Sequence, residues 1–220
     1  MKQQYNLNFL KPFILFPKFV IRLNIVIVAA IALLFSGCDD DDEAPVIPLE
    51  ATEVKDLDAT NTKNFTLFSF KNNAVVASAD SATSNWDIGF LGTTIILNGG
   101  TSGLGQTSGQ ITTGIFDELT EAPESGYVFD SETEKAIKGS NGWYTYTGTT
   151  SVPNHAILPI AGKILVFKTS EGNYVKAEII SYYQGNPDTS TPAFADLAAR
   201  PASRYYTFRF LYQPDGSRNF

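Results

Sequence analysis

From about Leu49 to the C-terminus, apolar residues do not recur with the 3.6-residue period of an amphipathic helix over any long stretch. Short alternating or β-branched runs recur instead, separated by Gly, Asn, Ser, Thr and Pro. This pattern predicts an all-β fold, a single antiparallel multi-stranded sheet or sandwich domain over residues 51–220. The predicted strands are residues 65–70, 75–77, 86–91, 93–97, 110–113, 143–147, 156–158, 164–169, 175–183 and 205–212.

The last of these runs shows clear alternation. Tyr206, Phe208, Phe210 and Tyr212 fall on one face of the strand, and the opposite face is not wholly polar either. We therefore expect a sheet that is partly covered on both sides.

The sequence indicates turns and helices less clearly than strands. The dipeptide Glu171-Gly172, between two predicted strands, favours a tight hairpin turn. One helical turn is expected at residues 194–199, inside a Pro-rich connection. The stretch 117–138 has room for another short helix, although no capping residue marks its start well.

The first 37 residues have the pattern of a secretion signal. All four charges in this segment are positive, and the uncharged apolar run 25–35 follows them. This run is too short for a transmembrane helix, which needs roughly 20 apolar residues. Ser36-Gly37-Cys38 resembles a bacterial lipobox, although Phe35 stands where Leu is usual. We expect Cys38 to be lipidated, with palmitate among its acyl chains; the alternative is an uncleaved N-terminal anchor.

An acidic run follows the cysteine. Residues 39–43 are all Asp or Glu, which predicts a solvated tether over residues 38–50. A Cys followed by acidic residues also resembles the lipoprotein export signal of Bacteroidetes, which predicts an outer-membrane anchor facing the cell surface. Removal of residues 1–37 takes away four basic residues and no acidic ones, leaving 12 basic and 23 acidic residues and a net charge of −11.

Composition excludes several classes of protein. The chain has one Cys and one His, so a disulfide framework, a CxxC-type metal site and a His-rich metal centre are ruled out. The negative charge argues against a nucleic-acid partner, because neutralising phosphates requires a surplus of Lys and Arg.

The most glycine-dense segment is the loop 98–109, NGGTSGLGQTSG. It contains neither GxGxxG opening a helix nor GxxxxGK[ST], so a nucleotide site is not predicted. We interpret it as a flexible loop between two strands; the alternative is a loop whose backbone approaches a ligand closely.

His155 is the candidate metal ligand. A lone His in a loop is more often a surface or hydrogen-bonded residue, but a neutral imidazole can serve as a single axial ligand of haem iron. The sequence contains no GxSxG motif, and lipidation of Cys38 would remove the thiol that a Cys–His pair requires. We therefore predict that the protein is not an enzyme.

Three aromatic residues precede His155 in the sequence. Trp143, Tyr144 and Tyr146 stand close to it across a Thr-rich bend, and such a cluster could stack on a flat apolar ligand or on a sugar.

Four segments together resemble the HmuY-like haem-binding lipoproteins of Bacteroidetes. They are residues 85–90 (NWDIGF), 97–105 (LNGGTSGLG), 163–183 (KILVFKTSEGNYVKAEIISYY) and 204–216 (RYYTFRFLYQPDG). The resemblance implies an all-β domain that captures haem outside the cell for iron acquisition, usually beside a TonB-dependent receptor.

The chain departs from that family in its candidate iron ligands. The resemblance implies two His or two Met side chains on the haem iron, whereas this chain has one His and its only Met is Met1. What remains is His155 alone, His155 with a phenolate of Tyr144 or Tyr146, or His155 shared between two chains. The alternative function is a surface binding or scaffold lipoprotein with the same fold, whose ligand is a glycan or a partner protein.

Overall fold

The computed structural model describes residues 49–220, which belong to one compact unit. The predicted signal peptide, Cys38 and nearly all of the acidic tether lie outside the described residues. The strands are β1 (Thr52–Asp58), β2 (Thr66–Ser69), β3 (Ala74–Val76), β4 (Ile88–Leu91), β5 (Thr94–Leu97), β6 (Ser108–Thr113), β7 (Tyr144–Tyr146), β8 (Ile157–Pro159), β9 (Lys163–Lys168), β10 (Tyr174–Tyr183) and β11 (Ser203–Gln213).

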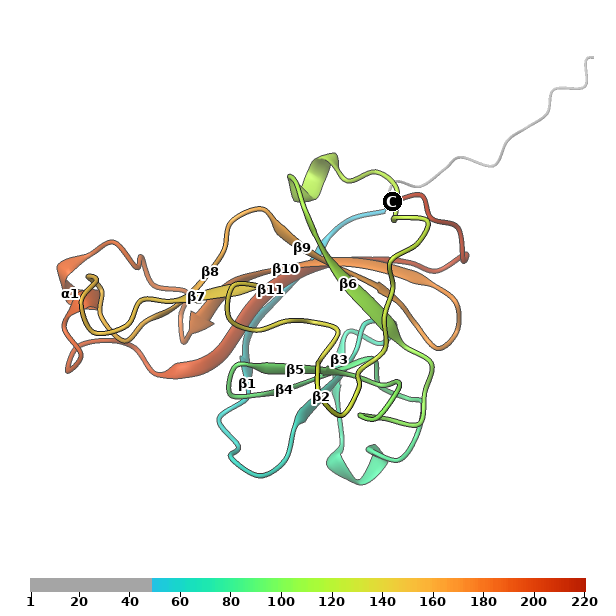
Figure 1. The fold of residues 1–220 in the computed structure, drawn as a ribbon, viewed down its shortest axis with the longest axis horizontal. Coiled ribbons are helices and arrows are strands. Elements are labelled where there is room, and N and C mark those ends of the chain that lie inside the picture. The colour runs from blue at the N-terminus through green and yellow to red at the C-terminus, as the bar shows by residue number, and fades with distance from the viewer. Residues whose placement is uncertain (1–48) are drawn as a thin grey trace, which may run out of the picture. The chain divides into compact units, whose positions relative to one another are not determined.

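The strands form two facing sheets and a separate hairpin (Figure 1). One sheet has the order β1-β11-β10-β9-β6 and the other has the order β3-β2-β4-β5, with neighbouring strands antiparallel in both. The β7–β8 hairpin lies beyond the sheets, at one end of the long strands β10 and β11. The prediction of an all-β fold is confirmed, and every predicted strand is present with its ends shifted by at most a few residues.

Aromatic side chains from both sheets fill the space between them. Phe68 of β2 packs against Phe208 of β11 with ring centroids 5.4 Å apart, and Phe90 of β4 packs against Tyr206 at 4.6 Å. Burial of such large rings contributes much of the free energy of folding. A second, smaller cluster, which includes Ile164, covers the other face of the five-stranded sheet, so the expected coverage of both faces is confirmed.

Strand β1 was not predicted from the sequence. Its partly buried Val54 and buried Leu57 are three positions apart, because the pairing with β11 shifts register between them and Asp56 has a positive φ of 51°. A bulge of this kind breaks the period of two on which strand prediction depends.

The β9–β10 hairpin confirms the turn predicted at Glu171-Gly172, where Gly172 adopts a φ of 88°. The expected helical turn is present as α1 (Pro192–Ala195), two residues earlier than the first predicted position, and the Thr191 hydroxyl accepts a hydrogen bond from the Phe194 N–H to cap it. The helix expected in 117–138 is wrong: only the 3-10 turn Phe116–Glu118 overlaps that stretch. No helix within residues 49–220 is long and apolar enough to cross a membrane.

Candidate functional site

The β7–β8 hairpin, residues 143–160, carries the residues predicted to bind a ligand. Together with residues 184–202, which connect β10 to β11 and contain α1, it forms a projection that we call the distal lobe (Figure 1). The hairpin pairs Tyr146 with Ile157, and the loop between them brings His155 back beside Tyr146.

Local hydrogen bonds fix the backbone at His155. Its N–H donates to the carbonyl of Gly148 over 2.7 Å, and its φ of 51° lies in the left-handed region. The Thr147 hydroxyl donates to the carbonyl of Pro153 and accepts from the N–H of Ala156. A non-glycine residue in this region costs conformational energy. The hydrogen bonds around His155 offset this cost and hold the loop in one shape.

The imidazole of His155 is paired at one nitrogen. Its Nδ1 lies 2.7 Å from the phenol oxygen of Tyr146, and both side chains are exposed. When Nδ1 carries the proton and donates to the phenol oxygen, the lone pair of Nε2 is left free for a metal. The hydrogen bond at Nδ1, the nitrogen that would not bind the metal, also orients the ring, as is usual for metal-binding histidines.

The other two aromatic residues point elsewhere. Trp143 is only 1% exposed, and its ring packs against Tyr206 with centroids 5.5 Å apart. Its indole N–H donates to the carbonyl of Thr93, and the half-buried Tyr144 donates to the hydroxyl of the same residue. The structure therefore places Trp143 in the core, and of the three aromatic residues only Tyr146 forms a hydrogen bond with His155.

Arg200 holds the His155 loop in place and was not identified from the sequence. Its guanidinium donates to the carbonyls of Asn154 and His155, and its Nε donates to that of Phe194, over whose ring it lies at 4.7 Å. Arg200 is about 45 positions from Asn154 and His155 in the sequence, and no spacing motif indicates this contact.

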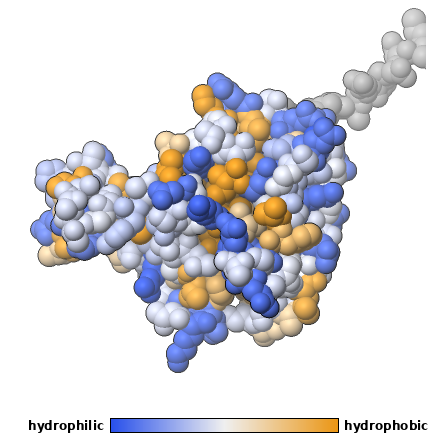
Figure 2. Space-filling model, in the orientation of Figure 1, coloured by the Kyte–Doolittle hydropathy of each residue, from blue (hydrophilic) through white to orange (hydrophobic). Residues whose placement is uncertain are grey.

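Apolar side chains are also exposed on the distal lobe. Val152, in the loop before His155, is 84% exposed, and Leu197, just after α1, is 56% exposed. Figure 2 shows apolar surface on this lobe as small patches among paler and hydrophilic side chains. A flat apolar ligand with a metal at its centre matches this combination of exposed apolar surface and an imidazole that can present Nε2 to the metal when Nδ1 carries the proton.

Metal binding by a cluster of side chains finds no support in the described part of the chain. Residues 49–220 contain no group of three or more His, Cys, Asp or Glu side chains that could hold a metal ion.

Comparisons with known proteins give the family. The family model described as HmuY protein matches residues 61–195. The apo HmuY analog (TFO) of Tannerella forsythia has a similar fold, with a TM-score of 0.50 at 12% identity over 76% of this chain and 97% of that one. No curated protein matches the chain.

Two further solved structures are more distant in shape. One is a Bacteroides vulgatus protein described as an HmuY-like heme-binding protein, with 15% identity over 74% of this chain and 91% of that one, and a TM-score of 0.44. The other is a Bacteroides fragilis protein described as a lipoprotein, with 14% identity over 75% of this chain and 91% of that one, and also a TM-score of 0.44. Because the family model covers more than half of its residues, the chain belongs to the HmuY family.

Proposed function

We propose that this protein is a surface lipoprotein that binds haem or a related porphyrin, with His155 as the iron contact. The observation that carries the proposal is the Tyr146–His155 pair, which orients an exposed imidazole; in the tautomer that carries its proton on Nδ1, Nε2 is left free to bind iron. Membership of the HmuY family supports it, and so does the description of a family neighbour as heme-binding. The protein is a binding protein rather than an enzyme.

The residues present fit a porphyrin held through one histidine. When bound, haem would supply an iron atom that accepts a nitrogen ligand and a large apolar face that needs cover. His155 would hold the iron, and the exposed apolar side chains of the distal lobe, such as Val152, would cover part of the porphyrin face. Tyr146 would orient the imidazole, and Arg200 would keep its loop in position.

The proposed location follows from the N-terminal segment. Lipid on Cys38 would anchor the chain in the outer membrane, and the acidic tether would carry the domain to the cell surface. A TonB-dependent receptor is the proposed partner that takes up the captured haem.

Haemin titration of residues 46–220, followed at the Soret band, tests the proposal for the parent chain, His155→Ala and Tyr146→Phe. We expect a saturable, shifted band for the parent, its loss in His155→Ala, and affinity lowered by about 10- to 100-fold in Tyr146→Phe, because an outer partner that orients a metal ligand typically contributes that much.

Three outcomes are informative. Loss of the band on substitution of His155 would support a haem carrier with a histidine ligand. An unchanged band in His155→Ala would contradict the role of that residue while keeping haem as the ligand. A parent chain that leaves the haemin spectrum unchanged at micromolar concentration would contradict haem binding itself.

A further inference from the structure

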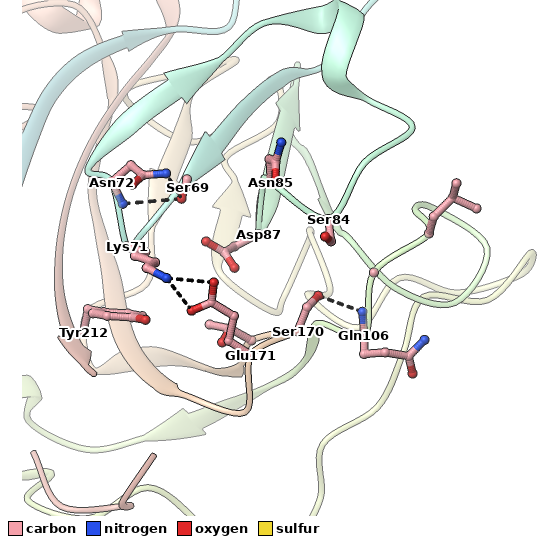
Figure 3. Close-up of a pocket in the computed structure, with 13 residues that line it drawn as sticks. Ser69, Lys71, Asn72, Ser84, Asn85, Asp87, Gln106, Ser170, Glu171 and Tyr212 are labelled. Carbon is pink, nitrogen blue, oxygen red and sulfur yellow. Dashed lines mark hydrogen bonds and ion pairs between the residues drawn. The ribbon is translucent and has the colours of Figure 1, made fainter. Parts of the chain in front are cut away.

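A second potential site lies at the opposite end of β10 from the distal lobe. A cavity of about 480 Å³ opens there, within the range of about 300–1,000 Å³ that is usual for small-molecule sites. Its wall comes from five segments (Figure 3): the β2–β3 turn, the residues before β4, the glycine-rich loop before β6, the β9–β10 turn and the end of β11.

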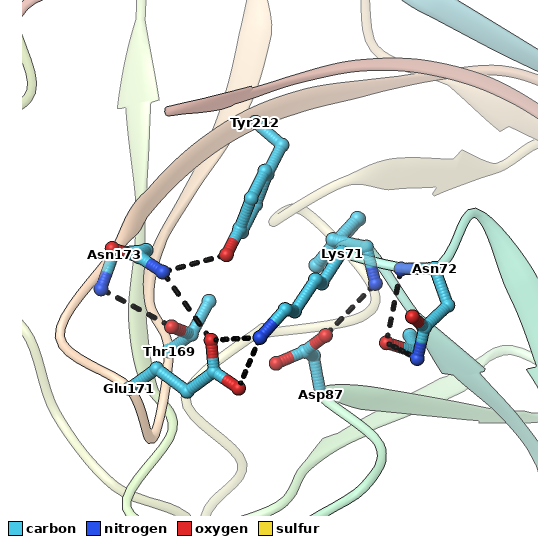
Figure 4. A network of polar contacts seen from close by, with 9 residues as sticks. Lys71, Asn72, Asp87, Thr169, Glu171, Asn173 and Tyr212 are labelled. Atoms are coloured by element: carbon cyan, nitrogen blue, oxygen red, sulfur yellow. Dashed lines mark hydrogen bonds and ion pairs between the residues drawn. The ribbon is translucent and has the colours of Figure 1, made fainter. Parts of the chain in front are cut away.

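The buried carboxyl group of Asp87 lies in this cavity wall. Asp87 is 8% exposed, and its Oδ2 accepts a hydrogen bond from the Phe70 N–H over 2.8 Å (Figure 4). The other carboxyl oxygen remains able to accept hydrogen bonds from a ligand. Burial raises the pKa of Asp87 to about 6, a shift typical of functional carboxyl groups in clefts.

An ion pair crosses the cavity next to Asp87. The ammonium of Lys71, in the β2–β3 turn, contacts both carboxylate oxygens of Glu171, in the β9–β10 turn, at 2.9 Å each (Figure 4). Glu171 thus offsets the charge of Lys71, and within residues 49–220 no Lys or Arg forms an ion pair with Asp87. The cavity is consequently unfavourable for an anion.

The rest of the wall is rich in hydroxyl and amide groups. Ser84, Asn85 and Gln106 supply side chains that can both donate and accept hydrogen bonds. Tyr212 contributes a ring to the wall, and its phenol oxygen is held by the Asn173 side-chain amide at 2.6 Å. An aromatic ring beside a carboxylate and several amides suits a molecule with many hydroxyl groups and apolar C–H faces.

Hydrogen bonds within the protein hold the wall in place. The N–H of Gln106 donates to the Ser170 hydroxyl over 2.8 Å, which ties the glycine-rich loop to the β9–β10 turn. The N–H of Gly105 donates to the buried side chain of Asn98 over 2.9 Å. Walls that are fixed in advance lower the entropic cost of binding a ligand.

We propose that this cavity binds an uncharged sugar, either free or at the end of a glycan, with Asp87 and Asn85 as its main hydrogen-bonding partners. The carboxylate of Asp87 would accept from two sugar hydroxyls or share one with the amide of Asn85, and the ring of Tyr212 would lie against the C–H face. This site is separate from His155 and does not depend on haem binding.

Saturation-transfer NMR and calorimetry on residues 46–220 test the proposal with a panel of neutral hexoses, N-acetylhexosamines and their methyl glycosides. We expect at least one sugar to bind, and both Asn85→Ala and Asp87→Asn to weaken it by about tenfold or more, the effect of losing one good hydrogen bond. Asn85 is exposed, so its substitution leaves the fold intact. Glu53→Gln, on β1 and outside the cavity, is the matched control and should bind as the parent does.

The results distinguish the end of a glycan chain from a free sugar, and both from no sugar binding at all. Binding of a methyl glycoside would support the end of a glycan chain as the ligand, and binding of reducing sugars alone would support a free sugar. If no sugar in the panel bound at about 10 mM, well above a Kd of about 1 mM, the proposal would be overturned. Equal binding by the parent, Asn85→Ala and Asp87→Asn would overturn it as well.

Discussion

At the scale of single residues, the Asp87 carboxyl group of the cavity is expected to make the free energy of unfolding depend on pH. Its pKa is raised from 3.8 to about 6, chiefly by burial; the Phe70 N–H and the Lys71 ammonium lower the pKa, and the Glu171 carboxylate acts in the same direction as burial. The folded chain therefore binds this proton more tightly than the unfolded chain does. Below about pH 4 both states are protonated and there is no effect; as pH rises from about 4 to 6, the unfolded state ionises first and stability falls.

Asp87→Asn should remove this pH dependence. We expect the variant to match the parent near pH 4 and to be more stable above pH 6, by up to about 3 kcal/mol, since each pKa unit corresponds to about 1.4 kcal/mol. The Asn side-chain oxygen can still accept from the Phe70 N–H, so that hydrogen bond is kept. Urea unfolding followed by tryptophan fluorescence between pH 4 and 8 measures the difference, with Glu53→Gln as the control.

A variant less stable than the parent at pH 8 would contradict this account, because it would show that the carboxylate is favoured where it lies. The expected result has a functional meaning. A carboxyl group that costs stability when ionised is more easily explained by a role in binding than by a role in folding.

The candidate sites differ in how far the sequence could predict them. Tyr146 and His155 are nine positions apart on either side of a bend, so their proximity could be anticipated. The burial of Trp143 could not, because it depends on Tyr206 of a distant strand. Asp87 and Glu171 meet only through the fold, and in a chain with 23 acidic residues neither stands out.

At the scale of elements, the glycine-rich loop needs glycine because its backbone packs closely against buried side chains. The loop wraps around Asn98, which is fully buried and donates to the carbonyls of Thr83 and Trp86. A Cβ on Gly103 would lie 2.2 Å from the Asn98 side-chain oxygen and 2.9 Å from the Trp86 ring. The glycines thus allow close packing within the protein, and the loop is fixed rather than flexible.

Gly103→Ala should therefore destabilise the fold. We expect a loss of about 1–3 kcal/mol, the usual cost of overpacking, measured by urea unfolding at constant pH. Gly114→Ala is the matched control, because the nearest atom to its added Cβ is 3.8 Å away on Ile164. If Gly103→Ala were as stable as this control, the loop would be able to move away from Asn98, and the packing argument would be wrong.

Some strands can be located from their own residues, whereas others depend on contacts with distant parts of the chain. Runs such as β11 alternate because each face of the strand meets a different core, so the sequence alone locates them. In β1 the bulge between Val54 and Leu57 removes the alternation, and the strand is held by its pairing with β11 instead. Short helices such as α1 depend on a cap and on the packing of Phe194, and so their positions shift by a few residues from the sequence prediction.

At the scale of the whole molecule, the long strand β10 connects the two proposed binding sites. It begins at Tyr174 near the proposed sugar cavity and ends at Tyr183, whose phenol accepts a hydrogen bond from the Ile157 N–H in the distal lobe. The proposed haem and sugar sites thus lie at opposite ends of the same strand. A domain held at the cell surface could then contact a glycan with one end while the other end remains open to haem.

The proposed attachment of the domain to the membrane depends on the N-terminal segment. The apolar run 25–35 is too short to span a bilayer, where roughly 20 residues are needed, so we predict that stable attachment requires lipid on Cys38. We expect the full-length parent, made in a bacterium that processes lipoproteins, to incorporate labelled palmitate and to partition into detergent. Cys38→Ser should do neither, and Ser151→Ala, in the distal lobe, should behave as the parent does. If Cys38→Ser still partitioned into detergent, the N-terminal run would be an uncleaved anchor, and the acidic residues after it would be a spacer from a protein anchor rather than from a lipid.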